Sequence, residues 1–352
     1  MMRTLTVTSS RHTYPLFMGE GVFNTREFQA ALKNPERIWV THASLLPLLT
    51  PIYQALSLRS DLETVLLIPE GESYKTLKTW EDLLAQMLAY RFSRNSILIA
   101  LGGGVVSDLS GFASACYLRG ISYITVPTTL LAMVDASVGG KTGVNHPLGK
   151  NLIGAFYPPS GVFIHPQYLK TLPEREWRSG LAEVVKYGFI FDKNFLIQLS
   201  GWLPEIEARD PRVLCEILFR CCEIKAQIVA QDERDQGMRM ILNFGHTLGH
   251  ALENAAGYGE LLHGEAVSIG MCYALDLSVR EGFLSKTEAA FGQALLKKLG
   301  LPTEIPPEIS RDKIVEALCL DKKHTASGYR LILLEKLGMA REWVCDIDGV
   351  FI

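Results

Sequence analysis

The sequence predicts an α/β domain followed by a mainly helical domain, because short β-rich runs alternate with helical patterns only in its first half. Four compact apolar runs have the character of buried strands in a mostly parallel, Rossmann-like sheet: RIWVTH (37–42), TVLLIP (64–69), SILIAL (96–101) and SYITVP (122–127). Between the second and third runs, apolar residues from Thr76 to Tyr90 recur at helical spacing, which predicts a helix that connects two parallel strands.

After about Pro173 helical periodicity dominates, for example in RSGLAEVVKYGFI and VLCEILFRCCEIKAQIVAQDE. Pro and Gly are frequent from Asn145 to Pro173, so this stretch is predicted to connect two domains, residues 1–172 and 173–352. A chain of 352 residues is long enough for two domains, since single cores stop growing near about 250–300 residues. Near the C-terminus, YRLILLE (329–335) is predicted to form a short strand.

The charge balance argues against nucleic-acid and anionic-membrane partners. Thirty-five basic and 38 acidic residues give a formal net charge of −3, without the basic excess that such partners select. The seven cysteines include no C-x-x-C pair, which favours reduced, buried thiols. No apolar run approaches the ~18 residues of a membrane span, and the N-terminus lacks the pattern of a secretion signal. We therefore expect a cytoplasmic protein.

A glycine turn follows the third predicted strand directly and precedes a helical pattern. Gly102, Gly103 and Gly104 would place backbone N–H groups and the positive end of a helix dipole where a pyrophosphate can approach. The spacing differs from G-x-G-x-x-G, so a tight structural turn and a nucleotide site both remain open.

A second glycine pair precedes Lys141 but does not form a P-loop. That pattern requires glycine at position 135, where this chain has Asp135. Lys141, together with Lys150 and Asn151, nevertheless forms a polar cluster in an apolar, glycine-rich region. A solvated loop and an anion-binding site are both consistent with this pattern.

Three of the eight histidines lie close together in the second half. His246 and His250 are four residues apart on a predicted helix, and His263 follows in LLHGEAV. Such a pair with a more distant third ligand is typical of a catalytic zinc site. Spacing alone would select both His246 and His250 as ligands.

Several cations lie in otherwise apolar helical surroundings. Lys186 follows Glu183 by three residues, which places both side chains on one helix face. Lys225 and Arg239 flank the acidic run DERD. Surface ion pairs would explain each separately, but beside a metal and an anion site they favour a pocket for phosphate and carboxylate groups.

These motifs, in this order, resemble the 3-dehydroquinate synthase family. The matching segments extend from about residue 69 to 324 and include PEGESYKTL, ALGGGVVSDLSGFASACYLRG, VPTTLLAMVDASVGGKTGVNHPLGKNLIGAFYPP, LKTLPEREWRSGLAEVVKYG, DERDQGMRMILNFGHTLGHALE, LLHGEAVSIGM and LDKKH. The resemblance implies an N-terminal NAD-binding domain, a helical metal- and substrate-binding domain, a homodimer, and Zn²⁺ or Co²⁺ as the metal.

The resemblance also implies roles for individual residues. The implied metal ligands are Glu183, His246 and His263, which moves His250 to the substrate. The implied NAD contacts are Glu72, Lys75, Gly103, Gly104, Val105, Asp108, Thr128, Thr129, Lys141, Lys150 and Thr171. The implied catalytic residues are Asp135, Lys141, Lys186, Asn243 and His250. The implied substrate-binding residues are Arg119, Lys150, Asn151, Lys225, Arg239 and Lys322 or Lys323.

The implied reaction converts 3-deoxy-D-arabino-heptulosonate 7-phosphate, a small sugar phosphate, into 3-dehydroquinate and phosphate, with NAD reduced and reoxidised in each cycle. Three positions depart from the family pattern: His42 replaces an acidic residue, Ser107 a glycine and Asp235 a glutamate. The alternatives are another sugar phosphate cyclase, a metal-dependent glycerol-type dehydrogenase, or an inactive NAD- or metal-sensing regulator. Arg239 with Asn243 favours a substrate with a carboxylate, and the number of cations favours a phosphate.

Overall fold

The computed structural model describes residues 2–9, 12–33, 36–59, 63–235, 237–257, 260–320, 324–325 and 328–345. The chain forms two compact units, the first from residues 1–172 and 214–234 and the second from residues 173–213 and 235–352. Within the described residues, no helix combines the length and the apolar character that crossing a membrane requires.

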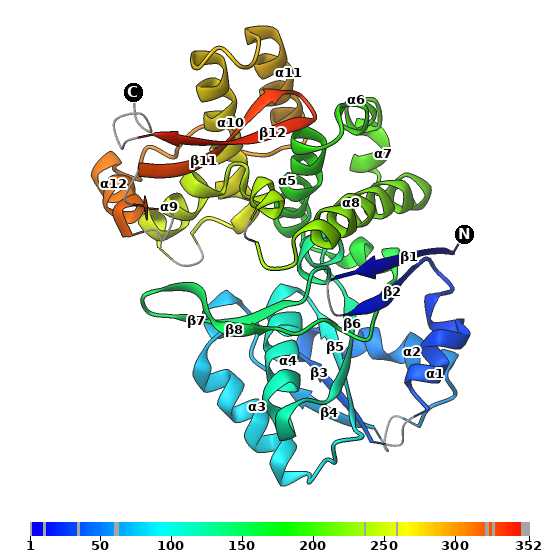
Figure 1. The fold of residues 1–352 in the computed structure, drawn as a ribbon. Helices are drawn as coiled ribbons and strands as arrows, with labels where there is room; N and C mark the ends of the chain where they lie inside the picture. The colour runs from blue at the N-terminus through cyan, green and yellow to red at the C-terminus, as the bar shows by residue number, and fades with distance from the viewer. Residues whose placement is uncertain are drawn as a thin grey trace. The chain divides into compact units, whose positions relative to one another are not determined.

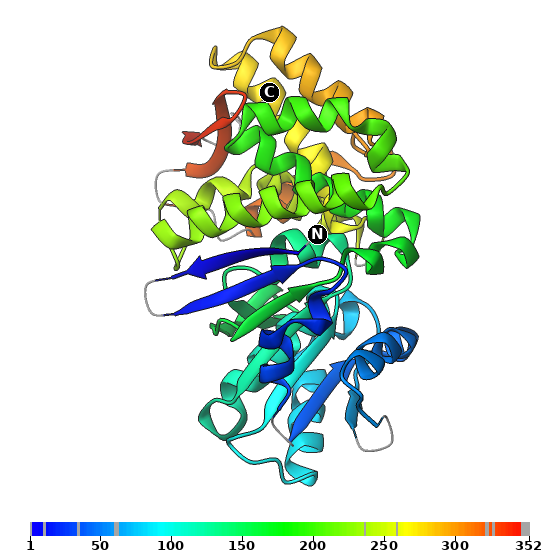
Figure 2. The ribbon, with the colours of Figure 1, turned by 90° about the vertical axis from the view of Figure 1, so that its right-hand side faces the viewer.

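The first unit is built on a seven-stranded sheet that is parallel except at one edge (Figure 1). In spatial order its strands are β1 (Arg3–Thr8), β2 (Thr13–Met18), β9 (Gly161–Ile164), β6 (Ser122–Pro127), β5 (Ile97–Gly102), β3 (Arg37–Thr41) and β4 (Thr64–Leu67). Only β1 pairs antiparallel, with β2, and the two form the hairpin visible in Figure 2. All four strands predicted from apolar runs are confirmed.

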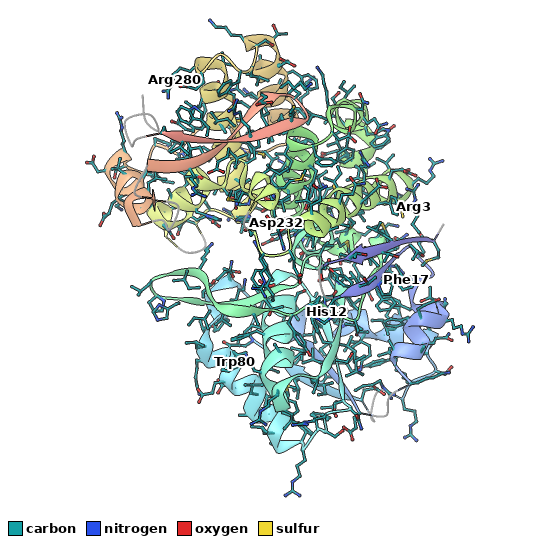
Figure 3. All side chains as sticks on the ribbon, viewed as in Figure 1. Arg3, His12, Phe17, Trp80, Asp232 and Arg280 are labelled. Atoms are coloured by element: carbon teal, nitrogen blue, oxygen red, sulfur yellow. The ribbon has the colours of Figure 1, made fainter. Side chains whose placement is uncertain are left out.

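Helices cover both faces of this sheet. They are α1 (Arg26–Ala31), α2 (Leu49–Ala55), α3 (Leu77–Ala89) and α4 (Gly104–Cys116), with short turns η1 (Val22–Asn24) and η2 (Ala43–Leu48). Alternate side chains of β3 point to opposite faces of the sheet. Ile38 and Val40 share a core with α3 and α4, whereas Trp39 contacts Tyr53 of α2. Trp80 of α3 (Figure 3) stacks on Phe112 of α4 within that core. The helix predicted over 76–90 is therefore α3, which begins after the capping residue Thr76.

The order of the strands defines where a ligand can bind. From β4 across the sheet, the order is β4-β3-β5-β6-β9, so the chain runs one way from β3 to β4 and then reverses across β3 to reach β5. In doubly wound sheets the ligand crevice lies at such a reversal, beyond the carboxyl ends of the strands. Here this place is the ends of β3 and β5.

Residues 145–172 of the stretch predicted to connect the domains are part of the first unit, so that prediction is wrong. It contributes β8 (Gly149–Phe156), which forms a hairpin with β7 (Lys141–His146), and the buried strand β9 inside the main sheet. The strand β9 has only four residues, GVFI, and follows two prolines. The glycines and prolines of residues 145–172 mark turns between short strands rather than a linker between domains.

The second unit is mainly helical, as predicted. Its helices are α5 (Glu174–Ile190), α6 (Lys193–Gly201), α7 (Leu203–Glu207), α9 (His246–Ala256), α10 (His263–Arg280), α11 (Lys286–Lys298) and α12 (Arg311–Leu320). A three-stranded sheet completes it: β10 (His324–Thr325), β11 (Gly328–Lys336) and β12 (Met339–Cys345). The predicted strand 329–335 is therefore confirmed as β11, and all of α5 from Trp177 to Ile190 except Arg178 is buried.

The second domain was expected to include all of residues 173–352, but residues 214–234 pack with the first unit. These residues contain most of the helix α8 (Pro211–Gln231). Its thiol Cys222 donates to the carbonyl oxygen of Met133 at 3.3 Å, and its Glu216 pairs with Arg3. Helical periodicity predicted this helix but carries no information about which core receives its apolar face.

Candidate functional site

Three side chains from three helices converge inside the second unit. Glu183 lies in the middle of α5, while His246 and His263 are the first residues of α9 and α10. Their possible ligand atoms all lie within 4.8 Å of one another. Nε2 of His246 is 3.5 Å and Nε2 of His263 is 3.7 Å from Oε1 of Glu183. We call these three residues the Glu-His-His trio.

Two glycines permit the close helix packing that brings the trio together. A Cβ on Gly264 would lie 1.8 Å from the carbonyl oxygen of Ser179 on α5, so only glycine fits directly after His263. A Cβ on Gly270 of α10 would lie 1.9 Å from the carbonyl oxygen of Gly245, the residue directly before His246. The backbone N–H of Gly264 also donates to Oγ of Ser179 at 3.0 Å. These contacts fix α10 against α5 and α9.

The trio concentrates charge in a buried place. Glu183 is fully buried and pairs with the equally buried Lys186, one helical turn further along α5. Burial alone would lower the pKa of His263, but hydrogen bonding and charge from Glu183 and Glu253 outweigh it and raise that pKa to about 10. Buried carboxylates beside imidazoles favour the binding of a divalent cation, because buried charges are paired or coordinate a metal.

The donor set of the trio fits zinc or a similar divalent metal. Two imidazole nitrogens and one carboxylate oxygen make the three-ligand pattern of catalytic zinc sites, which leave a further position open. The ring of His246 is held through Nδ1, which lies 3.0 Å from the carbonyl oxygen of Phe244. Its other nitrogen, Nε2, faces Glu183.

His250 lies beside the trio, outside it. Its ring centroid is 5.4 Å from that of His246 and 6.0 Å from that of His263. It belongs to a second, overlapping group with Glu253 and His263. Among the residues that the structure describes, no group with metal-ligand geometry contains both His246 and His250, so the pairing predicted from spacing alone is wrong.

Two further predicted residues of the second unit lie on the segment that leads into α9. Arg239 and Asn243 both belong to the turn η8 (Met238–Asn243), and the Arg239 side chain is buried. Lys322 and Lys323 fall outside the described residues. Glu253 is a functional candidate that the sequence reasoning missed, although it follows His246 by seven residues and therefore shares its helix face.

In the first unit, several of the residues expected to contact NAD follow the carboxyl ends of parallel strands. Gly103 caps α4 directly after β5, and Val105 lies in the first helical turn. Thr128 and Thr129 follow β6, where the backbone N–H of Thr128 donates to the carbonyl oxygen of Gly102 at 3.0 Å. A Cβ on Gly103 would come within 3.1 Å of the Thr129 side chain. The glycine turn thus provides a helix N-terminus at the sheet's ligand-binding edge.

A polar network extends this edge. Nζ of the buried Lys75 lies 2.5 Å from Oδ2 of Asp108 and 2.6 Å from Oδ1 of Asn151. Burial opposes the charge of Lys75, but Asp108 and Glu72 outweigh it and raise the Lys75 pKa, so the side chain stays charged. Asn145, which the sequence reasoning missed, joins the network by donating to Glu72 at 2.7 Å and accepting from the Asn151 N–H at 2.9 Å.

A second ion pair lies in the same unit. Nζ of Lys225, a buried residue of α8, is 2.6 Å from both Oδ1 and the carbonyl oxygen of Asp135. Asp135 lies on the π-helical turn η6 (Ala132–Ala136), a distortion often found at functional sites. The structure therefore joins two residues, 90 positions apart in the sequence, that were expected to serve the same substrate.

Four expected residues lie elsewhere on the first unit. Lys141 begins β7 and Lys150 lies on β8 of the adjoining hairpin. Thr171 ends η7 (Pro166–Thr171), which follows β9. Arg119 lies on η5 (Tyr117–Arg119), after the last residue of α4 and thus about 20 Å of helix away from the glycine turn. Within one chain the fold does not bring Arg119 to that turn.

The departures from the family pattern have local partners. The Oγ of Ser107 lies 3.2 Å from the carbonyl oxygen of Gly103, so the hydroxyl turns back on its own helix. Nδ1 of His42 lies 2.8 Å from Oγ of Ser44 and 3.6 Å from Oε2 of Glu70, which keeps a carboxylate near the end of β3. Asp235 adopts φ +61°, a left-handed backbone conformation.

A doubly wound nucleotide-type sheet in one unit and, in the other, a trio of residues with the geometry of metal ligands are typical of metal-dependent, nucleotide-using enzymes. Residues 65–179 match the family described as 3-dehydroquinate synthase N-terminal, and residues 180–324 match 3-dehydroquinate synthase C-terminal. The chain belongs to the 3-dehydroquinate synthase family, as its motifs predicted.

A relative of the same name agrees with this assignment, and solved structures of two other synthases share the fold. The chain is 47% identical to the 3-dehydroquinate synthase of Teredinibacter turnerae over 341 residues, which cover 96% of this chain and 94% of that protein. A structure of 2-deoxy-scyllo-inosose synthase complexed with carbaglucose-6-phosphate, NAD⁺ and Co²⁺ is similar with a TM-score of 0.86 and 26% identity, covering 97% of this chain and 94% of the other. A 2-epi-5-epi-valiolone synthase from Streptomyces hygroscopicus with NAD⁺ and Zn²⁺ bound gives a TM-score of 0.86 and 28% identity, with coverages of 97% and 96%.

Proposed function

We propose that this chain is a lyase that converts 3-deoxy-D-arabino-heptulosonate 7-phosphate into 3-dehydroquinate and phosphate, with NAD and one divalent metal as cofactors. The observation that carries the proposal is the convergence of Glu183, His246 and His263 in a chain of the 3-dehydroquinate synthase family. Relatives of the same fold with NAD⁺ and Zn²⁺ or Co²⁺ bound support the cofactors.

The metal-binding residues would be the trio, and the carboxyl edge of the first unit's sheet would hold NAD. When bound, NAD supplies a reversible hydride acceptor and the metal supplies Lewis-acid polarisation of substrate hydroxyls. Glu183 and its partner Lys186 would be fixed before substrate arrives, since both are buried and paired. Such preorganised charge is worth more in a buried place than in water.

The substrate requires two anion sites and several proton-handling groups. The guanidinium of Arg239 is buried and suits a planar carboxylate, which it can bind through two parallel hydrogen bonds. For the phosphate we propose Lys150 and Asn151, together with one of Lys322 or Lys323. Arg119, which the resemblance also implies, would reach this phosphate only from the second subunit of a homodimer, because in one chain it lies beyond the far end of α4. Lys141, Asn243 and His250 would orient hydroxyls and relay protons, and the Lys225–Asp135 pair would hold a further part of the substrate.

The test is a phosphate-release assay on purified protein with the heptulosonate phosphate and NAD. We expect release of inorganic phosphate without net formation of NADH, because NAD ends each cycle oxidised. Steady accumulation of NADH would instead indicate a dehydrogenase. Phosphate release from a hexose 6-phosphate without a carboxylate, and none from the heptulosonate, would indicate another sugar phosphate cyclase.

We also propose a cytoplasmic homodimer. The cysteine pattern, which favours reduced thiols, and the lack of a membrane-type segment in the sequence support the location, and the family resemblance supports the dimer. Light scattering coupled to size-exclusion chromatography tests the latter, since a dimer should give twice the chain mass of 39.1 kDa.

A further inference from the structure

The two imidazoles of the trio are arranged alike. Each presents Nε2 toward Oε1 of Glu183, at 3.5 Å for His246 and 3.7 Å for His263. Each also has an acceptor at its other nitrogen. For His246 this acceptor is the carbonyl oxygen of Phe244, 3.0 Å from Nδ1, and for His263 it is Oε1 of Glu253, 3.5 Å from Nδ1.

Glu253 is a buried carboxylate in an apolar part of α9. It is 5% exposed and follows the buried residues Ala251 and Leu252. A buried carboxylate is costly unless it is paired, so a residue of this type in such a place requires a polar partner. The ring of His263 provides one, and α9 thereby supplies both a trio member at its first residue and a contact to the other histidine two turns later.

We propose that Glu253 is a positioning residue, which holds the ring of His263 through Nδ1 so that Nε2 is directed to the metal. This inference rests on the proposed function, because it requires a metal at the trio. An acceptor at Nδ1 fixes the neutral tautomer that carries hydrogen there and leaves the lone pair of Nε2 for the metal. A carboxylate acceptor also makes the imidazole a stronger ligand.

The overlapping group His250, Glu253 and His263 offers the other assignment, in which Glu253 is itself a metal ligand. That assignment would bind metal through the Nδ1 side of His263, which faces Glu253, and would place the ion away from Glu183. The trio is favoured because Glu183 and His246 are more deeply buried than His250 and because His246 is oriented in the same way. The two assignments differ in which variants lose metal.

The experiment compares Glu253→Ala and Glu253→Gln with Asn254→Ala, a control at an exposed position on the same helix. Zinc affinity is measured by competition with a chelating dye, and the visible spectrum of the cobalt-substituted protein reports ligand geometry. We expect Glu253→Ala to bind zinc about 10–100-fold more weakly than wild type and to shift the cobalt spectrum at full occupancy. Glu253→Gln keeps an acceptor oxygen and should lie between, while Asn254→Ala should match wild type.

The outcomes separate this inference from the proposed function. If wild type and Glu253→Ala bind one zinc with equal affinity and give the same cobalt spectrum, the positioning role is overturned while the metal site stands. If His250→Ala loses metal as completely as the Glu253 variants do, Glu253 is a ligand and the inference is also wrong. A wild-type protein that binds no metal overturns both. Should Glu253→Ala fail to fold, the same comparison is made with Glu253→Gln, for which a wild-type spectrum and affinity would contradict the proposal.

Discussion

Replacing Gly264 by alanine tests how strictly the trio depends on helix packing. The added Cβ would lie 1.8 Å from the carbonyl oxygen of Ser179, whereas ordinary contacts begin at 3.4 Å. The start of α10 must therefore move away from α5 by about 1.6 Å, the difference between these two distances. His263 precedes Gly264 directly and would move with it, away from Glu183.

A shift of this size is large compared with a coordination bond. Zinc holds nitrogen and oxygen ligands at about 2.0–2.2 Å, so His263 would no longer reach a metal held by the other two residues. We expect zinc affinity to fall by at least about 100-fold. Phosphate release should fall by a similar factor, since about 1 Å of misplacement already costs about 100-fold in rate. Overpacking should also destabilise the chain by about 1–3 kcal/mol.

The matched control is Gly201→Ala at the end of α6, because a Cβ there meets nothing within 4 Å. Dye competition gives the zinc affinity of both variants, and urea unfolding of the metal-free proteins gives their stability. We expect the control to match wild type in zinc affinity and to be equally stable or more stable by up to about 1 kcal/mol, because alanine is favoured over glycine in a helix. A Gly264→Ala protein that binds zinc as tightly as wild type would refute the reasoning, because it would show that the trio tolerates separation of α5 and α10.

Three further predictions concern the metal. His246→Ala should lose bound metal, whereas His250→Ala should keep it and lose turnover; equal metal loss, measured by elemental analysis, would restore the ligand pair predicted from spacing. In the metal-free protein the pKa of His263 is raised to about 10, so its ring is protonated at neutral pH and must release that proton to bind metal. Apparent zinc affinity should therefore fall about tenfold for each pH unit below 10, and an affinity that does not change between about pH 6 and pH 8 would contradict this assignment. Treatment with a chelator should abolish phosphate release and added zinc or cobalt should restore it, whereas full activity in the chelated protein would exclude a metal role.

The sequence predicts those parts of the fold whose signal is local. Continuous apolar runs such as SILIAL and the helical spacing over 76–90 correspond to β5 and α3, because a buried strand and an amphipathic helix each impose their own period. The four-residue strand β9 was missed, because its neighbouring prolines and glycines resemble a linker. The assignment of α8 to the first unit depends on tertiary packing, which periodicity does not encode.

In the candidate site, too, the sequence predicts local features but not the contacts that depend on tertiary packing. Spacing placed His246 and His250 on one helix face, which is correct, but could not show that Glu183 of α5 completes the group with His246 and His263. That contact depends on the approach of three helices, and only the family resemblance supplied it. Glu253 carried a usable local signal, its place seven residues after His246, but such a signal identifies a shared face without identifying a partner.

The central claim is that one metal ion binds between Glu183, His246 and His263. The most direct test is a crystal structure of the zinc-loaded protein with anomalous scattering recorded at the zinc edge. We expect one peak per chain at about 2.0–2.2 Å from Nε2 of both histidines and from a carboxylate oxygen of Glu183. A peak beside His250 and Glu253, or the absence of any peak near Glu183, would contradict the account.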